Sequence, residues 1–501
     1  MFQKVLIANR GEIACRVIRA LRELGVGCVA IYSEADAHAL HVRMADEAYC
    51  VGGALASESY LNAEAILNAA RQSGAEAIHP GYGFMSENAD FAEACKTAGI
   101  IFIGPSPESI RAMGSKTDAR QLMIKAGVPV VPGNTEPLED AASAREIAQK
   151  VGYPILLKAA AGGGGKGMRL VNSEEELEKS LDAAKREASS AFGDDRVYLE
   201  KAILGPRHIE IQVLADQKGN CVHLFERECS VQRRHQKVIE ESPAVGLSEE
   251  VRDEMGRVAV QGAQSIDYVG AGTFEFLVDN EQNYYFLEMN TRLQVEHPVT
   301  EMVTGVDLCA LQIRIAAGEP LPFSQGDLKQ RGHSIECRLY AEDPAMNFAP
   351  SPGPLLRYRA PLGPGVRVDD GVREGDEIPM HYDPMIAKLC VWAPSREEAI
   401  ARADRALGEY SVAGIRNNLN FLRWVLASVP FSEGRYDTGI LEKLGPYSAA
   451  EISSETKARL IAAACVAHMA REGESSGAAQ KTGSSVEPTA WRRAFSKGGS
   501  A

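Results

Sequence analysis

Five polar side chains recur at every second position in the segment FLEMNTRLQVEHPVTE, residues 286–301. They are Glu288, Asn290, Arg292, Gln294 and Glu296. In an extended chain all five would point to one face of a strand, while the apolar residues between them point to the other. An edge strand with a solvated face gives the same alternation. However, the mixture of both charge signs with amides favours a functional site. After Asn290 the chain either continues as a strand or bends into a loop.

A second acidic position suggests a metal ion. Glu275 lies in the predicted strand TFEFLVD, between Phe274 and Phe276. Together with Glu288 and Asn290 it offers three oxygen donors on neighbouring strands. Mg²⁺ binds a few protein oxygens and completes its shell with phosphate and water. The three residues therefore predict a magnesium–nucleotide site of the kind used in phosphoryl transfer.

Basic residues gather in places that suit phosphate or another oxyanion. The segment SVQRRHQKVIEE, residues 230–241, is predicted as a strand with His235 and Lys237 on one face. Its cations either face solvent or line an oxyanion pocket. Lys116 lies at the start of a predicted helix, where an anion would be stabilised. Lys158 ends an apolar strand, and Arg338 in GHSIECRLYAEDP is either half of a structural ion pair or a site cation.

Four consecutive glycines, Gly162–Gly165, follow Lys158 after three alanines in ILLKAAAGGGGKGMRLV. Such a run marks a loop that flexes or lets the backbone approach a ligand closely. It is not a P-loop, because that pattern requires glycine at 160 and serine or threonine at 167, where the chain has Ala160 and Gly167. A glycine flap, phosphate-binding lysines, a magnesium site and a basic pocket together predict an ATP-dependent ligase that phosphorylates a small oxyanion.

Strands and helices alternate over about the first 105 residues, which predicts an open, mostly parallel sheet. The predicted strands are KVLIA (4–8), CVAIYS (28–33), EAIHP (76–80) and IIFIG (100–104), and the predicted helices are Glu12–Leu24, Tyr60–Gln72 and Asn88–Ala98. The single glycine of IANRGEIACR lacks the GxGxxG pattern of a dinucleotide-binding oxidoreductase.

The rest of the chain reads as a lid and a larger α+β domain. Ser115 is predicted to cap a helix over Lys116–Ala126 that Gly127 ends, and residues 130–203 read as a small α/β unit with a helix at Glu174–Ala188. Further strands are predicted at 208–216, 221–228, 272–279, 284–290, 334–340 and 385–392. We expect an N-terminal α/β domain at 1–114, and a linker helix with a lid (from about 131) at 115–203. The larger α+β core and C-terminal domain would follow at 204–446, and a partly disordered extension at 447–501.

Composition narrows the class of protein. The chain has 501 residues, too many for a single core, and a formal net charge of −14, which argues against nucleic-acid binding. We find no apolar run near the roughly 18 residues that a membrane span needs. The chain enters a strand at once, so we expect no signal segment. The 10 scattered cysteines, without a CxxC pair, predict a reducing compartment and hence the cytoplasm.

Several long motifs resemble the biotin carboxylases of the ATP-grasp superfamily over residues 1 to about 446. They are LIANRGEIACRVIRA, HPGYGFMSENADFA, GPS, MGSK, AGGGGKGM, PRHIEIQV, ERECSVQRRHQKVIEE, GAGTFEFL, EMNTRLQVEHPVTE and IECRLYAEDP. The resemblance implies an α/β and α+β protein with the ATP-grasp fold. It also implies an N-terminal Rossmann-like (pre-ATP-grasp) domain, a mobile lid and a C-terminal biotin carboxylase domain. The implied reaction converts ATP, bicarbonate and biotin to ADP, phosphate and carboxybiotin.

The same resemblance implies a role for each matching residue. For ATP these are Lys116, Lys158, the flap Gly162, Gly163, Gly164 and Gly165, Glu200, Lys201, Ile203, His208, Gln232, His235, Glu275 and Glu288, with Glu200, Lys201 and Ile203 around the adenine. Glu275, Glu288 and Asn290 would hold Mg²⁺ or Mn²⁺. Lys237, Arg292, Gln294 and Val295 would hold bicarbonate, and Glu296 would deprotonate it. Arg338 would stabilise the biotin enolate, with Tyr82 and Glu87 near biotin.

Partners follow from the same resemblance. The family's carrier presents a lysine between methionines, and Met-Lys-Met does not occur in this chain. We therefore expect biotin on a separate carrier protein, a carboxyltransferase subunit and a homodimer. A helix at Glu455–Arg471 would pack on the body or dock a partner. Acetyl-CoA, propionyl-CoA and pyruvate all fit as final acceptor. A carbamoyl-phosphate-type ligase and a non-catalytic nucleotide sensor are the alternatives.

Overall fold

The computed structural model describes residues 1–134, 136–159 and 168–448, with short helical pieces at 454–455, 458–459, 461–466 and 468–469. The glycine flap and the tail beyond Arg471 lie outside these residues, and the predicted helix Glu455–Arg471 is described only in part. The chain divides into two compact units, Met1–Tyr447 and Ser448–Ala501. The finer domain boundaries stay predictions. Among the described residues, no helix is long and apolar enough to cross a bilayer.

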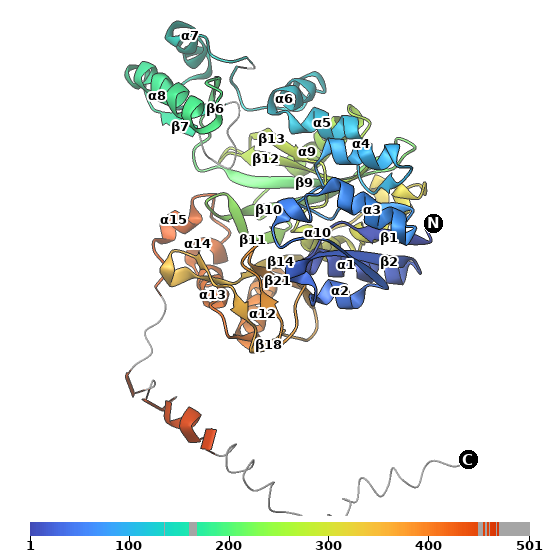
Figure 1. Ribbon diagram of the computed structural model, residues 1–501. Coiled ribbons are helices and arrows are strands. Elements are labelled where there is room, and N and C mark those ends of the chain that lie inside the picture. The colour runs from blue at the N-terminus through green and yellow to red at the C-terminus, as the bar shows by residue number, and fades with distance from the viewer. Residues whose placement is uncertain are drawn as a thin grey trace, which may run out of the picture. The chain divides into compact units, whose positions relative to one another are not determined.

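The N-terminal residues, blue in Figure 1, form the parallel sheet that the alternation predicts. Its strand order is β3-β2-β1-β4-β5. Its strands are β1 Lys4–Ile7, β2 Gly27–Ser33, β3 Glu47–Gly52, β4 Ala77–His79 and β5 Ile101–Phe102. Its helices are α1 Gly11–Glu23, α2 Leu40–Met44, α3 Ala63–Ser73, α4 Ala89–Thr97 and α5 Pro107–Gly114. The sequence analysis missed β3, whose mixed polar side chains lie at the sheet edge.

Helix starts differ from the predictions where asparagines cap them. Asn62 accepts a hydrogen bond from the main chain of Ala65, and Asn88 accepts one from that of Phe91. Both asparagines therefore lie just outside their helices, as N-caps do. Tyr60, predicted as the first residue of a helix, is instead fully buried in the core beside the sheet.

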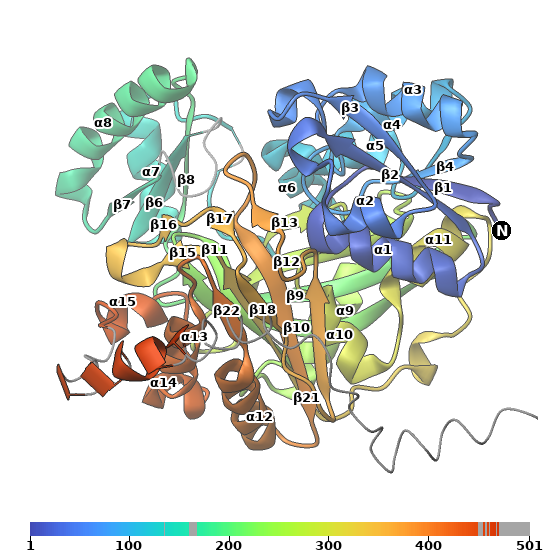
Figure 2. The same ribbon diagram turned by 60° about the horizontal axis from the view of Figure 1, so that its bottom comes forward.

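The predicted linker helix and lid are present. Ser115 caps α6 (Lys116–Lys125) through the main-chain N–H of Asp118, and Gly127 has a φ of +75°. The lid elements are α7 Ala141–Val151, β6 Ile155–Ala159, β7 Met168–Val171, α8 Glu174–Phe192 and β8 Val197–Lys201. The antiparallel sheet β7-β6-β8 packs its apolar face on α8 (Figure 2).

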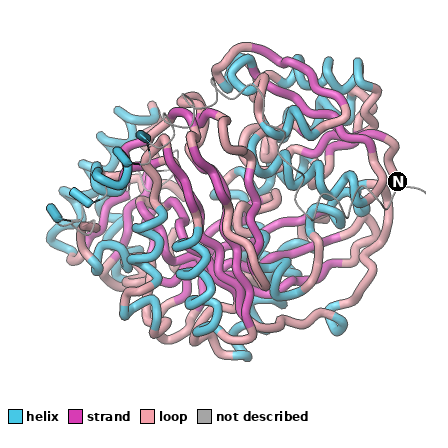
Figure 3. Tube along the Cα trace, turned by 90° about the horizontal axis from the view of Figure 1, so that it is seen from below, coloured by secondary structure: helices cyan, strands magenta, loops and turns pink. Residues whose placement is uncertain are grey.

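A larger antiparallel sheet, whose strands are among those drawn in magenta in Figure 3, joins all the later predicted strands. Its strand order is β13-β12-β9-β10-β11-β14-β21-β19. Its strands are β9 Arg207–Ala215, β10 Cys221–Arg233, β11 Gln236–Ser242, β12 Gly270–Val278, β13 Tyr284–Asn290, β14 His333–Tyr340, β19 Val366–Asp370 and β21 Met385–Ala393. Around it lie α9 Glu249–Gln264, α10 His297–Thr304, α11 Leu308–Ala316, α12 Arg396–Glu409, α13 Leu419–Leu426, α14 Val429–Ser432 and α15 Ile440–Leu444. Short strand pairs complete the unit: β15 Glu342–Asp343 with β16 Ala349–Pro350, β17 Gly353–Pro354 with β20 Glu377–Ile378, and β18 Arg357–Arg359 with β22 Ser411–Ala413.

The two faces of this sheet differ in chemistry. In β9, Ile209 and Ile211 pack in the apolar core that α9 covers. Because side chains alternate along a strand, the intervening His208 and Glu210 face the other way. In the same manner β14 buries apolar side chains beside α12 and turns Arg338 to the opposite face. One face of the sheet therefore forms the core and the other carries charged groups.

The buried carboxylate of Glu241 contacts both the sheet and helix α12 and supports a stability prediction. Glu241 in β11 lies 2.6 Å from His333 Nε2 and 2.8 Å from Arg396 Nε, and it accepts the Tyr436 hydroxyl. Burial alone would raise the pKa of Glu241, but the bonds from His333 and Arg396 lower it to about 2. Because the folded pKa is below the usual value of 4.5, the stabilisation is complete above pH 4.5 and is lost as the pH falls toward 2.

We expect Glu241→Gln to lower the free energy of unfolding at pH 7 by about 3 kcal/mol. Urea unfolding followed by tryptophan fluorescence would measure it, and the difference from wild type should shrink as the pH is lowered below about 4.5. Glu442→Gln, an exposed acid on α15, is the control. A difference that does not change with pH would contradict the assignment.

Candidate active site

A cavity of about 1270 Å³ opens between the N-terminal sheet, the lid and the charged face of the large sheet. Its wall contains most of the predicted site residues: Tyr82, Lys116, Lys158, Glu200, His208, Gln232, His235, Lys237, Glu275, Glu288, Asn290, Arg292, Gln294, Val295, Glu296 and Arg338. Three described candidates, Glu87, Lys201 and Ile203, are not part of this wall. Residues from widely separated parts of the sequence thus meet at one place.

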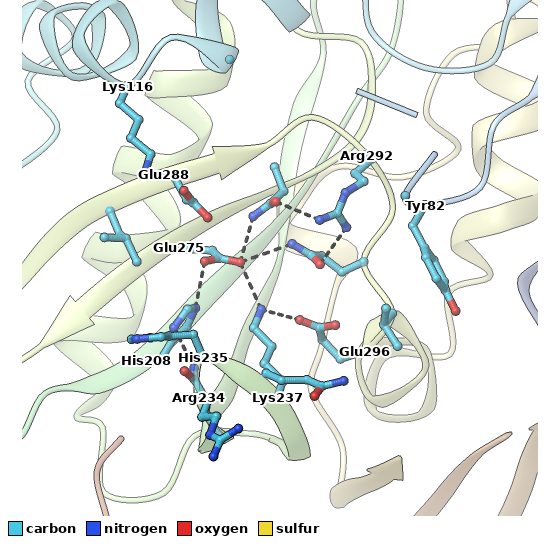
Figure 4. A pocket seen from close by; sticks show the side chains of 18 of the residues that line it. Tyr82, Lys116, His208, Arg234, His235, Lys237, Glu275, Glu288, Arg292 and Glu296 are labelled. Carbon is cyan, nitrogen blue, oxygen red and sulfur yellow. Dashed lines mark hydrogen bonds and ion pairs between the residues drawn. The ribbon is translucent and has the colours of Figure 1, made fainter. Parts of the chain in front are cut away.

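Glu275 and Glu288 face each other across β12 and β13, as Figure 4 shows. They are directly opposite in the antiparallel register. Asn290 donates from Nδ2 to Glu275 Oε1 at 2.8 Å. Burial, together with the negative charge of Glu275, raises the pKa of Glu288, as expected for two acids held close together. A divalent cation between them would relieve this repulsion, so the three predicted oxygen ligands fit Mg²⁺.

Lys237 joins this acidic pair to the rest of the site. Its ammonium lies 2.6 Å from Glu210, 3.0 Å from Glu275 and 2.6 Å from Glu296. Burial alone would lower the pKa of Lys237, but the three carboxylates outweigh it and hold the pKa well above its usual value. The charged ammonium therefore links the proposed metal ligands to Glu296.

The basic segment around Lys237 is a hairpin rather than one strand. β10 ends at Arg233 and β11 begins at Gln236, so Arg234 and His235 form the turn. Their φ angles, +51° and +67°, are typical of a two-residue hairpin turn. The prediction that His235 and Lys237 share a strand face is therefore wrong. Residue alternation does not reveal where a chain reverses, although both side chains do reach the cavity.

The chain after Asn290 bends, which was the alternative left open. β13 ends there, and the next regular element, α10, begins at His297. Side-chain hydrogen bonds hold the intervening turn. Arg292 donates from Nη2 to Asn290 Oδ1 at 3.0 Å and from Nη1 to Gln294 Oε1 at 2.9 Å. The polar side chains thus reach the cavity from a turn and not from one extended strand.

Glu296 is fully buried between two cations at the start of α10. One oxygen accepts from Lys237 at 2.6 Å and the other accepts from Arg338 Nη2 at 2.8 Å. Burial raises the pKa of Glu296, but these cations outweigh it and hold the pKa well below its usual range. Glu296 is therefore ionised at neutral pH, as a general base must be. Arg338, also 2.6 Å from Glu240, is both a buried ion-pair partner and a cavity residue.

Tyr82 and Glu87 occupy different positions relative to the cavity. The Tyr82 ring lines it on the side of Arg292 and Glu296 (Figure 4), and its hydroxyl donates to Glu12. Glu87 lies behind Arg292 and accepts from its Nε at 2.9 Å. Glu87 therefore supports Arg292, and its predicted place beside biotin stays untested.

The nucleotide-side lysines point in different directions. Lys116 extends from the first residue of α6 toward Glu288 (Figure 4). Lys158 hydrogen-bonds Glu200 on the neighbouring lid strand. The ammonium of Lys201 instead donates to the carbonyls of Gly152 and Tyr153 at 3.0 Å each, away from the cavity wall. The predicted place of Lys201 around the adenine stays untested.

The sequence analysis missed the buried charges that hold these residues. Arg227 is fully buried and donates from Nε to Glu210 at 2.6 Å, and Glu210 in turn binds Lys237. Lys388 is fully buried beside Glu12. A usable signal was present, because Glu210 in HIEIQV and Lys388 in MIAKLCVWA interrupt apolar strands. A charge in such a place must be paired.

Three family models together match most of this chain between residues 1 and 443. The biotin carboxylase N-terminal domain matches residues 1–110, the ATP-binding domain of the carbamoyl-phosphate synthase L chain matches 115–324, and the biotin carboxylase C-terminal domain matches 336–443. The chain belongs to the biotin carboxylase family. Its members are ATP-dependent ligases, so the dinucleotide-binding oxidoreductase is excluded. The flanking domains separate it from carbamoyl-phosphate ligases, which share the middle one.

Individual relatives agree with this family. Biotin carboxylase 1 of Bacillus subtilis is 52% identical over 443 residues, which cover 88% of this chain and 98% of that protein. The mouse mitochondrial methylcrotonoyl-CoA carboxylase subunit alpha is 53% identical over 439 residues, covering 87% of this chain. The chain spans only 61% of that subunit's length.

Solved structures confirm the biotin carboxylase fold. The biotin carboxylase domain dimer of Hydrogenobacter thermophilus 2-oxoglutarate carboxylase, in complex with MgADP, ADP and bicarbonate, superposes with a TM-score of 0.84. It is 51% identical, and the match covers 90% of this chain and 100% of that one. The Campylobacter jejuni biotin carboxylase gives the same TM-score at 49% identity, with coverage of 88% and 99%.

Proposed function

We propose that this biotin carboxylase family member carboxylates biotin with ATP and bicarbonate by way of carboxyphosphate. The observation that supports it most is the Lys237-centred arrangement, in which the facing pair Glu275 and Glu288 connects to Glu296 and Arg338 within one cavity. Phosphoryl transfer needs the first pair. Of the second pair, Glu296 would be the general base and Arg338 would stabilise an oxyanion. Both pairs lie on the large sheet and the turn that follows β13.

The nucleotide would lie between the lid and the large sheet. Lys116, Lys158 and His208 would contact its phosphates, and Lys158 would exchange its partner Glu200 for phosphate. Glu275, Glu288 and Asn290 would hold Mg²⁺, which neutralises the phosphate charge during transfer. A closed lid would exclude water from an intermediate that water destroys.

Bicarbonate would bind beside Lys237 and Arg292, with Gln294 and the main chain of Val295 completing the site. Glu296 would take the bicarbonate proton, and the freed oxygen would attack the γ-phosphorus of ATP while the bond to the ADP oxygen breaks. The products are carboxyphosphate and ADP.

Biotin would bind near Tyr82 and Arg338. Carboxyphosphate breaks down to CO₂ and phosphate, and the phosphate takes the proton from the biotin ureido nitrogen. The Arg338 guanidinium would stabilise the enolate oxygen that forms. The nitrogen then attacks CO₂ and gives carboxybiotin.

The test is ATP hydrolysis by the purified chain with and without bicarbonate and free biotin. We expect turnover that requires bicarbonate and increases on adding biotin, with ¹⁴C from bicarbonate recovered in carboxybiotin. Turnover that depends on neither would reject the proposal. Nucleotide binding without any turnover would favour the nucleotide sensor.

Partners are part of the proposal. We infer a biotinylated carrier, a carboxyltransferase and a homodimer, since relatives are named as subunits of larger carboxylases and one structural neighbour is a domain dimer. The final acceptor stays open, because relatives include methylcrotonoyl-CoA, pyruvate and propionyl-CoA carboxylases. All 10 cysteines are free thiols, which supports a reducing compartment such as the cytoplasm.

A further inference from the structure

Lys388 is a buried cation that the proposed chemistry does not use. It lies in the middle of β21, MIAKLCVWA, where every other side chain is uncharged, and it is fully buried. Placing an ammonium there is costly unless neighbouring groups compensate it. Burial alone would lower the pKa of Lys388, but nearby acids, Glu12 foremost, raise it above its usual value. The side chain is therefore charged.

Its contacts lead to the catalytic turn. Lys388 Nζ donates to the carbonyl of Val295 at 2.9 Å and lies 3.2 Å from Glu12 Oε1. Asp369, on the adjacent strand β19, is 3.8 Å away and is itself held by Arg367 at 2.7 Å. The Val295 carbonyl belongs to the peptide unit that joins Val295 to Glu296. A charged donor on this oxygen fixes the plane from which the Glu296 side chain departs.

The same ammonium is tied to the biotin end of the cavity. Glu12, at the start of α1, also accepts the Tyr82 hydroxyl, and the Lys388 ammonium lies 6.0 Å from the centre of the Tyr82 ring. The buried Lys388 and Glu12 thus connect the partly buried Tyr82 ring to the main chain beside the base.

We propose that Lys388 and Glu12 are positioning residues, Lys388 fixing the Val295–Glu296 peptide beside bicarbonate and Glu12 fixing the Tyr82 ring beside biotin. This inference rests on the proposed function and extends it. A small displacement of a base is costly, since misplacement by about 1 Å can lower a rate about a hundredfold. Lys388 and Glu12 act through the orientation of these groups.

The decisive variant is Glu12→Gln/Lys388→Met, which removes both buried charges together and leaves Asp369 paired with Arg367. We expect its kcat for bicarbonate-dependent ATP hydrolysis to fall about thirtyfold and its KM for bicarbonate to rise, with the KM for MgATP unchanged within about twofold. A thermal unfolding curve establishes that the variant is folded. General damage to the structure would not spare MgATP binding in this way.

A single variant separates the two roles. Glu12→Gln keeps the bond from Lys388 to Val295 but weakens the bond that Glu12 accepts from the Tyr82 hydroxyl. It should therefore raise the KM for free biotin about fivefold. Hydrolysis without biotin should stay within about twofold of wild type. If the double variant does not fold, the KM of Glu12→Gln for biotin tests the proposal instead. An unchanged KM for biotin overturns the proposal.

Cys390→Ala is the matched control, because Cys390 is buried two residues along β21 and contacts Glu336 instead. We expect its kinetics to stay within about twofold of wild type. A folded double variant with wild-type kcat, or an equal loss in Cys390→Ala, would overturn the positioning role. Bicarbonate-independent turnover by the wild type would instead reject the proposed function, so the two failures are distinguishable.

Discussion

Replacing Glu296 by Gln is expected to lower bicarbonate-dependent ATP hydrolysis by at least about a hundredfold, the usual contribution of a general base. The amide keeps the size of the carboxylate but cannot accept the proton. It also leaves Lys237 and Arg338 with one fewer negative partner. Steady-state kinetics should show the loss in kcat, with the KM for MgATP little changed.

Glu336→Gln is the control for this experiment. Glu336 is as buried as Glu296. It lies on β14, directly across from Glu240 on the adjacent strand β11. Its substitution removes an equally buried carboxyl that does not contact Lys237, although burial raises the pKa of Glu336 well above its usual value. Equal losses in both variants would mean that Glu296 acts only through the stability of the sheet.

Replacing Glu275 by Gln is expected to lower ATP turnover about a hundredfold at millimolar Mg²⁺ and to raise the Mg²⁺ concentration required for half-maximal activity. The reason is twofold. The change removes one of two facing carboxylates, and it removes an anion that contacts both Lys237 and His208. A magnesium titration of the initial rate measures the effect, and a chelator should abolish wild-type activity.

Glu281→Gln tests whether the loss is specific to the site. Glu281 is an exposed acid in the turn between β12 and β13, so this variant changes charge on the same hairpin without reaching the cavity. We expect a wild-type magnesium requirement. A Glu275→Gln variant with an unchanged magnesium requirement would refute the proposed metal ligands, whatever its rate.

The fold could be predicted from the sequence wherever the signal is local. The first strands and helices alternate clearly because buried parallel strands are continuously apolar and their helices end at glycines. The cap at Ser115 is also correct, since one side chain and one neighbouring N–H decide it. The edge strand β3 and the Arg234–His235 turn were missed, because a polar edge strand and a chain reversal leave weak local patterns.

The sequence by itself determined which residue types the site contains. Short motifs already contain the acid at Glu275, the pair Glu288 and Asn290 at two-residue spacing, and the cation at Lys237. Only the tertiary structure decided how they are held. It placed Lys237 among three carboxylates, turned Lys201 away from the cavity, and joined Lys388 to Glu12 and Val295. These contacts link residues that are far apart in the chain, and buried charges find their partners only when the sheet and its helices close around them.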